Sequence, residues 1–284
     1  MKKSGWIFFL FVAFASFAQQ DSTVLNRKLD LIKHVSILLK DSLKLQTGEH
    51  FYTEFVNNDS MFSYVYISDK DSVKNVLKDP YEYFGTHYTE AKIAADSFSR
   101  YGFDVMHYKT AGTSAALLNK RLLEYDSLSL VFILIHEAMH RHKKNSGAKF
   151  PYEYEEALGD VIANSFCGWY SGVSVKDFFA FAYRNEEIYR MINKCSEGKI
   201  SKKKCGKQIR KHLEGATLFQ NDRFNYAVNN AYLLGYSSYA KHYFELRELY
   251  QRMKDPKLFI DEMMKLPADV KGCETEIINL KRKY

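Results

Sequence analysis

The stretch from Ser127 to Lys144, SLSLVFILIHEAMHRHKK, decides the interpretation of this chain. Its first half is a continuous apolar run, Leu128 to Ile135, and Asp126 or Ser127 can cap the start of a helix. We therefore predict a helix over residues 127–144. Because its first half is so apolar, this helix must lie deep in the protein.

This helix carries His136-Glu137-Ala138-Met139-His140, an HExxH motif. At 3.6 residues per turn, His136 and His140 project from one face and can bind one Zn²⁺ at about 2.0–2.1 Å. Glu137 is adjacent to the pair but rotated away from it, so it can take a proton from a water that the metal activates. The alternative, a helix that carries two surface histidines by chance, fits poorly with the apolar run before them.

A zinc peptidase needs a third protein ligand and an open fourth position. A glycine and a proline follow the first helix, so the segment Tyr154-Glu155-Glu156-Ala157-Leu158-Gly159-Asp160 can return antiparallel as a second helix. We predict Glu156 as the third ligand, with Glu155 as its substitute. Asp160 lies on the same face and can accept a hydrogen bond from a zinc-bound histidine. An acidic first turn favoured by the helix dipole is the alternative for Glu155 and Glu156, but it leaves Asp160 unexplained.

HExxH followed by Glu-x-x-x-Asp resembles the gluzincin metallopeptidases, and the chain is similar to the bacterial family of predicted zinc aminopeptidases. The similarity spans about residues 50–265. It rests on the order of short pieces, which are Tyr83-Phe84-Gly85, Gly102-Phe103-Asp104-Val105, Val131 to His140, Glu156, and Asn229-Asn230-Ala231 with Tyr239. Two positions depart from the family pattern, with Glu155 in place of the usual Asn and Arg141 in place of Gln. They leave the metal site intact and affect the expected substrate preference.

The resemblance implies a peptidase, specifically an aminopeptidase, with one zinc per chain. It also implies that the segment from Asn229 to Tyr239 lines the cleft, where Tyr239 could donate to the oxyanion. The alternative is a core aromatic side chain and two helix-surface asparagines. An aminopeptidase needs a carboxylate for the free amine of its substrate, and Glu153 or Glu155 could supply it.

The first eighteen residues have the pattern of a secretory signal peptide. Lys2 and Lys3 precede an apolar run, and Ser16-Phe17-Ala18 forms a small-x-small cleavage site before Gln19. An uncleaved membrane anchor is the alternative, but the apolar run is short for a span. We expect export to the periplasm or the exterior, without stable membrane insertion of residues 19–284.

The charge balance does not favour a nucleic-acid partner. The chain has 41 basic and 34 acidic residues, or 39 and 34 once Lys2 and Lys3 are removed, which leaves a net charge of +5. The densest basic run, which spans 202–211, has no nucleic-acid-binding motif beside it and is interpreted as a solvated surface. We expect a peptide or protein substrate as the partner.

The remaining pattern predicts an α+β fold that is mostly helical, in which a small N-terminal α/β portion packs on a zincin-like helical catalytic portion. The strands expected are 61–68 and 103–108, and the helices are 21–45, 86–101, 127–144, 152–171, 175–194, 201–213 and 222–253, with shorter ones after Pro256 and Val270. We expect one domain over 19–284, with a front part of 19–125 and a helical part of 126–284.

Four cysteines leave disulfide pairing open. Cys195 and Cys205 bracket a polar segment that a disulfide could close, whereas Cys167 and Cys273 could pair or remain buried thiols. The sequence as a whole predicts an exported monozinc peptidase. The alternatives are an endopeptidase instead of an aminopeptidase, and a non-catalytic, zinc-stabilised binding or envelope protein.

Overall fold

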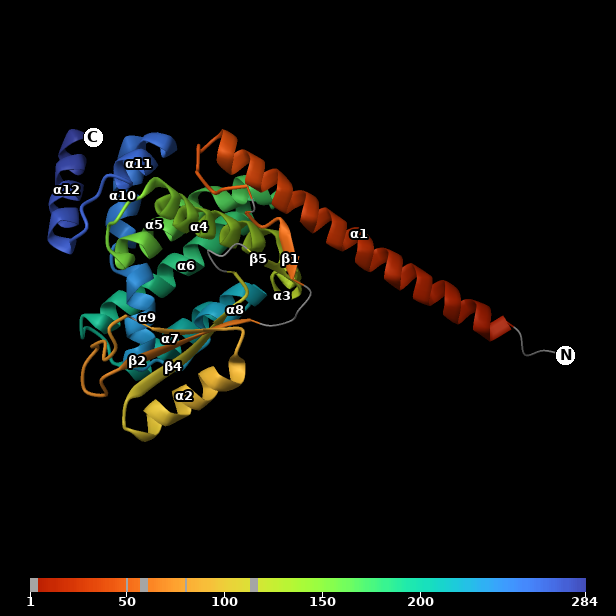
Figure 1. Cartoon of the computed structure of the whole chain (residues 1–284), viewed down its shortest axis with the longest axis horizontal. Helices are drawn as coiled ribbons and strands as arrows, with labels where there is room; N and C mark the ends of the chain where they lie inside the picture. Colours follow the sequence, from red (N-terminus) through yellow and green to blue (C-terminus); the bar gives the residue numbers. More distant parts are fainter. Residues whose placement is uncertain (1–4, 50, 57–60, 80, 113–116) are drawn as a thin grey trace.

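The computed structural model describes residues 5–49, 51–56, 61–79, 81–112 and 117–284, without the side chains of 5–22, 54–56 and 117. The fold is mostly helical with a small sheet near the N-terminus, which confirms the predicted α+β class (Figure 1). The elements are α1 (Gly5–Asp41), β1 (Glu54–Val56), β2 (Phe62–Ser68), β3 (Glu82–Gly85), α2 (Tyr88–Arg100), β4 (Asp104–Thr110), β5 (Leu117–Asn119), α3 (Lys120–Glu124), α4 (Ser127–Ser146), α5 (Tyr152–Ser171), α6 (Val175–Ser196), α7 (Lys202–Leu213), α8 (Leu218–Phe224), α9 (Asn230–Ala240), α10 (Tyr243–Met253), α11 (Pro256–Met263) and α12 (Val270–Lys283).

The antiparallel sheet β3-β2-β4 lies between helix α2 and the helical part of the chain. Side chains alternate along β2 because successive residues of a strand point to opposite faces. Val65 and Ile67 pack with α2, while Tyr64 and Tyr66 belong to the main core on the other face. Helix α9 approaches that second face closely, since a Cβ at Gly235 would lie 2.8 Å from Met106 Cε. The sheet therefore presents tyrosines toward the helices.

Helix α4 is the buried centre of the helical part. Asp126 caps the start of α4 by accepting a hydrogen bond from the Ser129 amide. The helix ends at Ser146 and is followed by Gly147, which adopts the left-handed conformation with φ of 74°. All residues from Leu128 to His136 are buried. Helix α5 packs against α4 in the opposite direction, and a continuous core of buried side chains extends from Ile32 to Leu280.

The structure differs from the predicted elements mainly after residue 217. The single helix expected over 222–253 is wrong, because the chain breaks into α8, α9 and α10. Asn229 causes one break, since its side chain caps α9 by accepting a hydrogen bond from the Tyr232 amide. The sequence also did not indicate β1, β3, β5 and α3, and the N-terminal helix ends at Asp41 instead of residue 45.

Residues 1–4 of the expected signal peptide, 1–18, lie outside the described residues, and 5–18 belong to α1. Among the helices that the structure describes, none is long and apolar enough to cross a membrane. All four cysteines are buried and free. Cys195 and Cys205 therefore form no disulfide, and Cys205 donates from Sγ to the carbonyl oxygen of Met191 at 3.6 Å.

Candidate metal centre

Three side chains from α4 and α5 converge on one point. His136 and His140 direct their Nε2 atoms toward each other at 3.0 Å. Glu156 adds its carboxylate, with Oε2 at 3.2 Å from His136 Nε2 and Oε1 at 3.6 Å from His140 Nε2. His136 and Glu156 are buried, and His140 is partly buried. These three residues form a group that could hold a metal ion.

The spacing of these atoms fits a tetrahedral zinc site. Ligands that lie about 2.0–2.1 Å from Zn²⁺ at tetrahedral angles are roughly 3.3 Å from one another. The three distances between the imidazole and carboxylate atoms, 3.0 to 3.6 Å, scatter around that value. Glu156 Oε2 is buried, and apart from the contact with His136 Nε2 it has no hydrogen-bond partner in the described structure, as expected for an atom that binds a metal.

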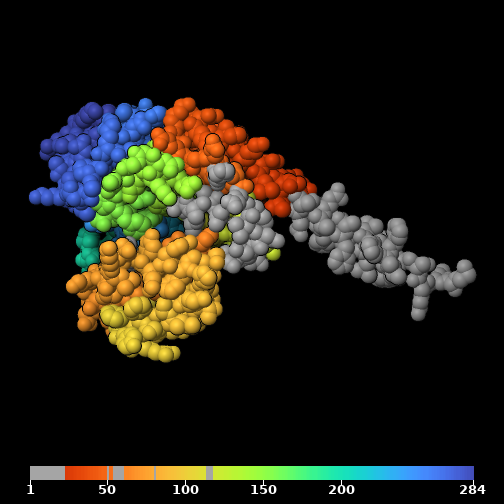
Figure 2. Space-filling model, viewed as in Figure 1, coloured from red at the N-terminus to blue at the C-terminus, as the bar shows by residue number. Residues whose placement is uncertain are grey.

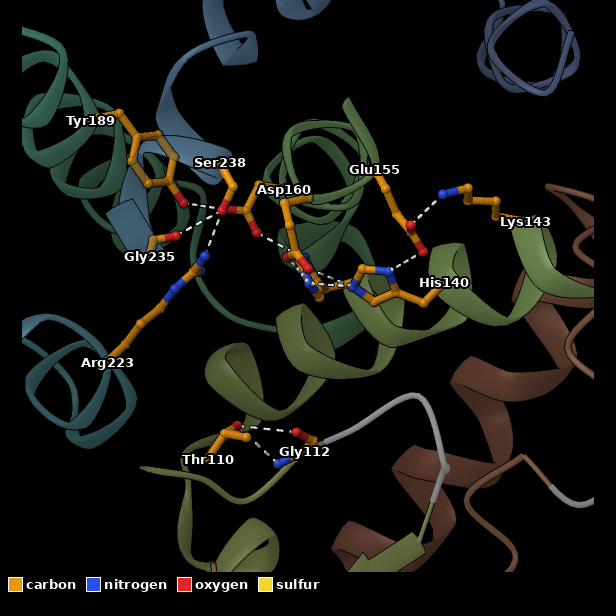
Figure 3. Close-up of polar contacts among 12 residues, drawn as sticks. Thr110, Gly112, His140, Lys143, Glu155, Asp160, Tyr189, Arg223, Gly235 and Ser238 are labelled. Carbon is orange, nitrogen blue, oxygen red and sulfur yellow. Dashed lines mark hydrogen bonds and ion pairs between the residues drawn. The ribbon is translucent and has the colours of Figure 1, made fainter. Parts of the chain in front are cut away.

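A carboxylate lies beside the second nitrogen of each imidazole. Asp160 Oδ1 is 2.8 Å from His136 Nδ1, and Glu155 Oε1 is 2.7 Å from His140 Nδ1. Such partners fix the tautomer that leaves Nε2 free to bind a metal, and they raise the basicity of the ligand. Asp160 was predicted in this position. Glu155 was predicted as a substitute ligand, but the structure places it behind His140 (Figure 3).

Gly159 lets α5 approach the imidazole of His136. A Cβ at this position would lie 2.7 Å from His136 Nδ1 and 3.0 Å from its Cε1, so any side chain would displace the ring. The glycine therefore brings Asp160 and Glu156, its neighbours on α5, within reach of the imidazole pair.

Asp160 is also the centre of a fully buried charge network. Its Oδ2 accepts hydrogen bonds from Arg223 Nη2 at 2.8 Å and from the hydroxyl of Tyr189 (Figure 3). Burial alone would raise the pKa of the Asp160 carboxyl, but Arg223 and His136 hold it at about 2. Burial would likewise lower the pKa of His136, yet Asp160 and Glu156 raise it to about 10. The carboxylates of the centre therefore favour a positive charge there, which a proton or a bound metal ion can supply.

Glu137 differs from the other acidic groups of the centre. Among the described residues, its carboxylate has no hydrogen-bond or ion-pair partner, and it lines a cavity that His136 and His140 also line. Burial raises the pKa of the Glu137 carboxyl, and the neighbouring His140 and His136 oppose that effect only in part. A carboxylate with a raised pKa and no partner is suited to proton transfer.

The cavity beside the centre has a volume of about 270 Å³ and a largely aromatic wall. Its residues come mainly from the sheet and from α4, α5, α8 and α9. In Figure 2 the orange and yellow atoms of the sheet and α2 lie beside the green atoms around residue 150. The aromatic residues are Tyr64, Tyr66, Tyr81, Tyr108, Phe132, Tyr152, Phe219 and Tyr239. The cavity therefore combines an apolar wall with hydroxyl groups next to the metal centre.

The residues suggested by the family resemblance separate into two groups. Tyr239 lines the cavity and stacks on His136, with ring centroids 6.0 Å apart. Asn229 caps α9, and Asn230 donates from Nδ2 to the carbonyls of Asp69 and Lys70, so both asparagines hold the backbone.

Glu153, one of the two candidates for binding a substrate amine, is not among the residues that line the cavity. Its Oε1 is paired with Lys241 Nζ at 3.0 Å, and His242 lies at 3.6 Å. The other candidate, Glu155, is held between His140 and Lys143.

The sequence did not indicate Arg223, Tyr189 or the cavity tyrosines other than Tyr239. The spacing of Tyr64 and Tyr66 in a predicted strand was a usable signal, because residues two apart share a face. Arg223 gave no local signal, since its partner Asp160 is 63 residues away.

Comparisons with protein-family models, with curated proteins and with solved structures found no match to this chain. What can be stated of the centre therefore rests on its own geometry. It is a buried group of two histidines and a glutamate, which resembles an HExxH motif with a downstream glutamate ligand.

Proposed function

We propose that this protein is a zinc-dependent peptidase with one metal ion, held by His136, His140 and Glu156. The observation that carries the proposal is the Glu137 carboxylate, which faces the cavity beside the three ligands and has no partner among the described residues. Zinc at this centre would polarise the scissile carbonyl and activate a water. Glu137 would take the proton from that water and pass it to the leaving amine.

A purely structural zinc site offers a different explanation of the same three ligands. Such sites fill all four positions with protein ligands, whereas this group has three and borders a cavity. A structural site also has no use for a free carboxylate beside it. We therefore favour the enzyme over a zinc-stabilised binding protein. Aminopeptidase action is implied by the family resemblance only.

The test compares wild-type protein with Glu137→Gln in a digest of a peptide library, with zinc content measured on both. We expect the variant to keep its zinc and to lose about 10²–10⁴-fold in rate, the usual contribution of a general base. Chelation should abolish wild-type activity, and added zinc should restore it. Equal rates for the two proteins would remove Glu137 from the mechanism, and a wild-type protein without peptidase activity would refute the function.

We also propose that the protein is exported and is cleaved after Ala18. The mass of the protein recovered from the periplasm or medium should then correspond to a chain that begins at Gln19. Recovery of the uncleaved chain in membranes would support the anchor instead.

A further inference from the structure

Lys144 lies at the mouth of the cavity. It follows His136 and His140 at spacings of four residues on α4, and it lines the same cavity. Of the described residues that line the cavity, Lys144 alone is exposed to solvent. A rise of 1.5 Å per residue places its Cα about 6 Å beyond that of His140 along the helix.

Apart from Glu137, the proposed general base, the other charges that line the cavity are already engaged. Arg223 is paired with Asp160. Glu155 is paired with His140 and Lys143, and Glu156 faces the imidazoles. Lys144 has no hydrogen-bond or ion-pair partner among the described residues. Its ammonium group is therefore the positive charge that this cavity leaves available to a ligand.

The two glutamates considered for binding a substrate amine also favour a negatively charged substrate group. Glu153 is paired with Lys241 and does not line the cavity. Glu155 is held between the imidazole of His140 and the ammonium group of Lys143. Neither carboxylate is therefore free to receive a substrate amine. The unpaired group at the mouth is positive instead. This arrangement favours a substrate that presents a carboxylate.

We propose that Lys144 binds a carboxylate of the peptide substrate and so positions the chain in the cavity; this inference rests on the proposed function. The separation of about 6 Å between the Cα atoms of His140 and Lys144 along the helix corresponds to roughly two residues of extended peptide at 3.3–3.6 Å each. The carboxylate is either the C-terminus of a short peptide or the side chain of Asp or Glu near the scissile bond.

Lys144 has a competing structural explanation. Lys143 and Lys144 both lie in the last turn of α4, where positive charge stabilises the helix dipole. A purely structural role would change stability and leave substrate preference unaltered. The two explanations therefore predict different measurements.

The experiment uses peptides in matched pairs, with a C-terminal acid against its amide and with Glu against Gln at each position around the cleaved bond. The proteins are wild type, Lys144→Gln, Lys144→Glu and the control Lys203→Gln, which removes an exposed lysine of α7 away from the cavity. We expect wild type to prefer one carboxylate peptide two- to fivefold through KM, the size of an exposed ion pair, with less preference at high salt.

Lys144→Gln should remove this preference, Lys144→Glu should reverse it, and Lys203→Gln should retain it. A preference within the acid and amide pair would identify the C-terminus as the carboxylate, whereas a preference within a Glu and Gln pair would identify a side chain. Equal KM ratios in wild type and Lys144→Gln would overturn the inference while leaving the peptidase function intact.

A binding measurement decides the inference without turnover. The same peptides are titrated into Glu137→Gln protein, with and without Lys144→Gln, and the Kd is followed by intrinsic fluorescence. Weaker binding of the carboxylate peptide on loss of Lys144 supports the inference even if wild type cleaves nothing, an outcome that would refute only the proposed function. Equal Kd values for acid and amide, or no binding of either peptide, would overturn it.

Discussion

The two imidazoles of the candidate metal centre are supported in very different surroundings. Behind His136, Asp160 is fully buried and shared with Arg223 and Tyr189. Behind His140, Glu155 is partly exposed and is paired with Lys143 near the cavity mouth. We call Asp160 the inner support and Glu155 the outer support. The inner support belongs to the core, and we expect it to stabilise the fold as well as the position of His136. The outer support should act mainly on the affinity for the metal.

The inner support should give the largest effect. Asp160→Asn leaves Arg223 buried without its counter-charge, which costs about 3–5 kcal/mol of unfolding free energy in comparable sites. Zinc affinity should also fall, by about 10–100-fold. Urea unfolding and competitive zinc titration measure the two quantities. If stability were unchanged, the buried network would not have the role assigned to it.

Removing the outer support should lower zinc affinity much more than it lowers the free energy of unfolding. Glu155→Gln removes the carboxylate behind His140, so zinc affinity should again fall by about 10–100-fold. The loss of unfolding free energy should be smaller, about 1–2 kcal/mol, since the group is partly exposed and no buried arginine loses its partner. A loss of stability as large as that of Asp160→Asn would show that the two supports are equivalent.

The smallest effect concerns the close approach of α5 to His136. Alanine usually stabilises a helix interior relative to glycine by about 1 kcal/mol. At Gly159 that gain should be cancelled, because the new Cβ would displace the His136 ring, and zinc affinity should fall. Gly206→Ala in α7 is the matched control, since its nearest contact would be an ordinary 3.4 Å. Equal responses at the two positions would argue against a packing constraint at Gly159.

The comparison also shows which features a sequence reveals. The predicted ligands His136, His140 and Glu156 lie on two neighbouring helices, where spacing of three to four residues defines a face. Asp160 was predicted for the same reason. The helical core was also predictable, because the apolar run before His136 requires burial.

The features that escaped prediction come from distant parts of the chain. Arg223 reaches Asp160 from α8, and the tyrosines of β2 and β4 reach the cavity only after the sheet has packed against α9. Such contacts depend on tertiary packing, which single-sequence patterns do not encode. The break of 222–253 into three helices has a different cause, because Asn229 is a local helix cap that the periodic apolar pattern masked.

The most direct test of the central claim is a crystal structure of the zinc-loaded protein, with the metal located by anomalous scattering at the zinc edge. We predict one zinc ion about 2.0–2.2 Å from His136 Nε2, His140 Nε2 and a carboxylate oxygen of Glu156, with a fourth position open to the cavity. Zinc bound elsewhere, or zinc at the two histidines with the Glu156 carboxylate turned away, would contradict the account.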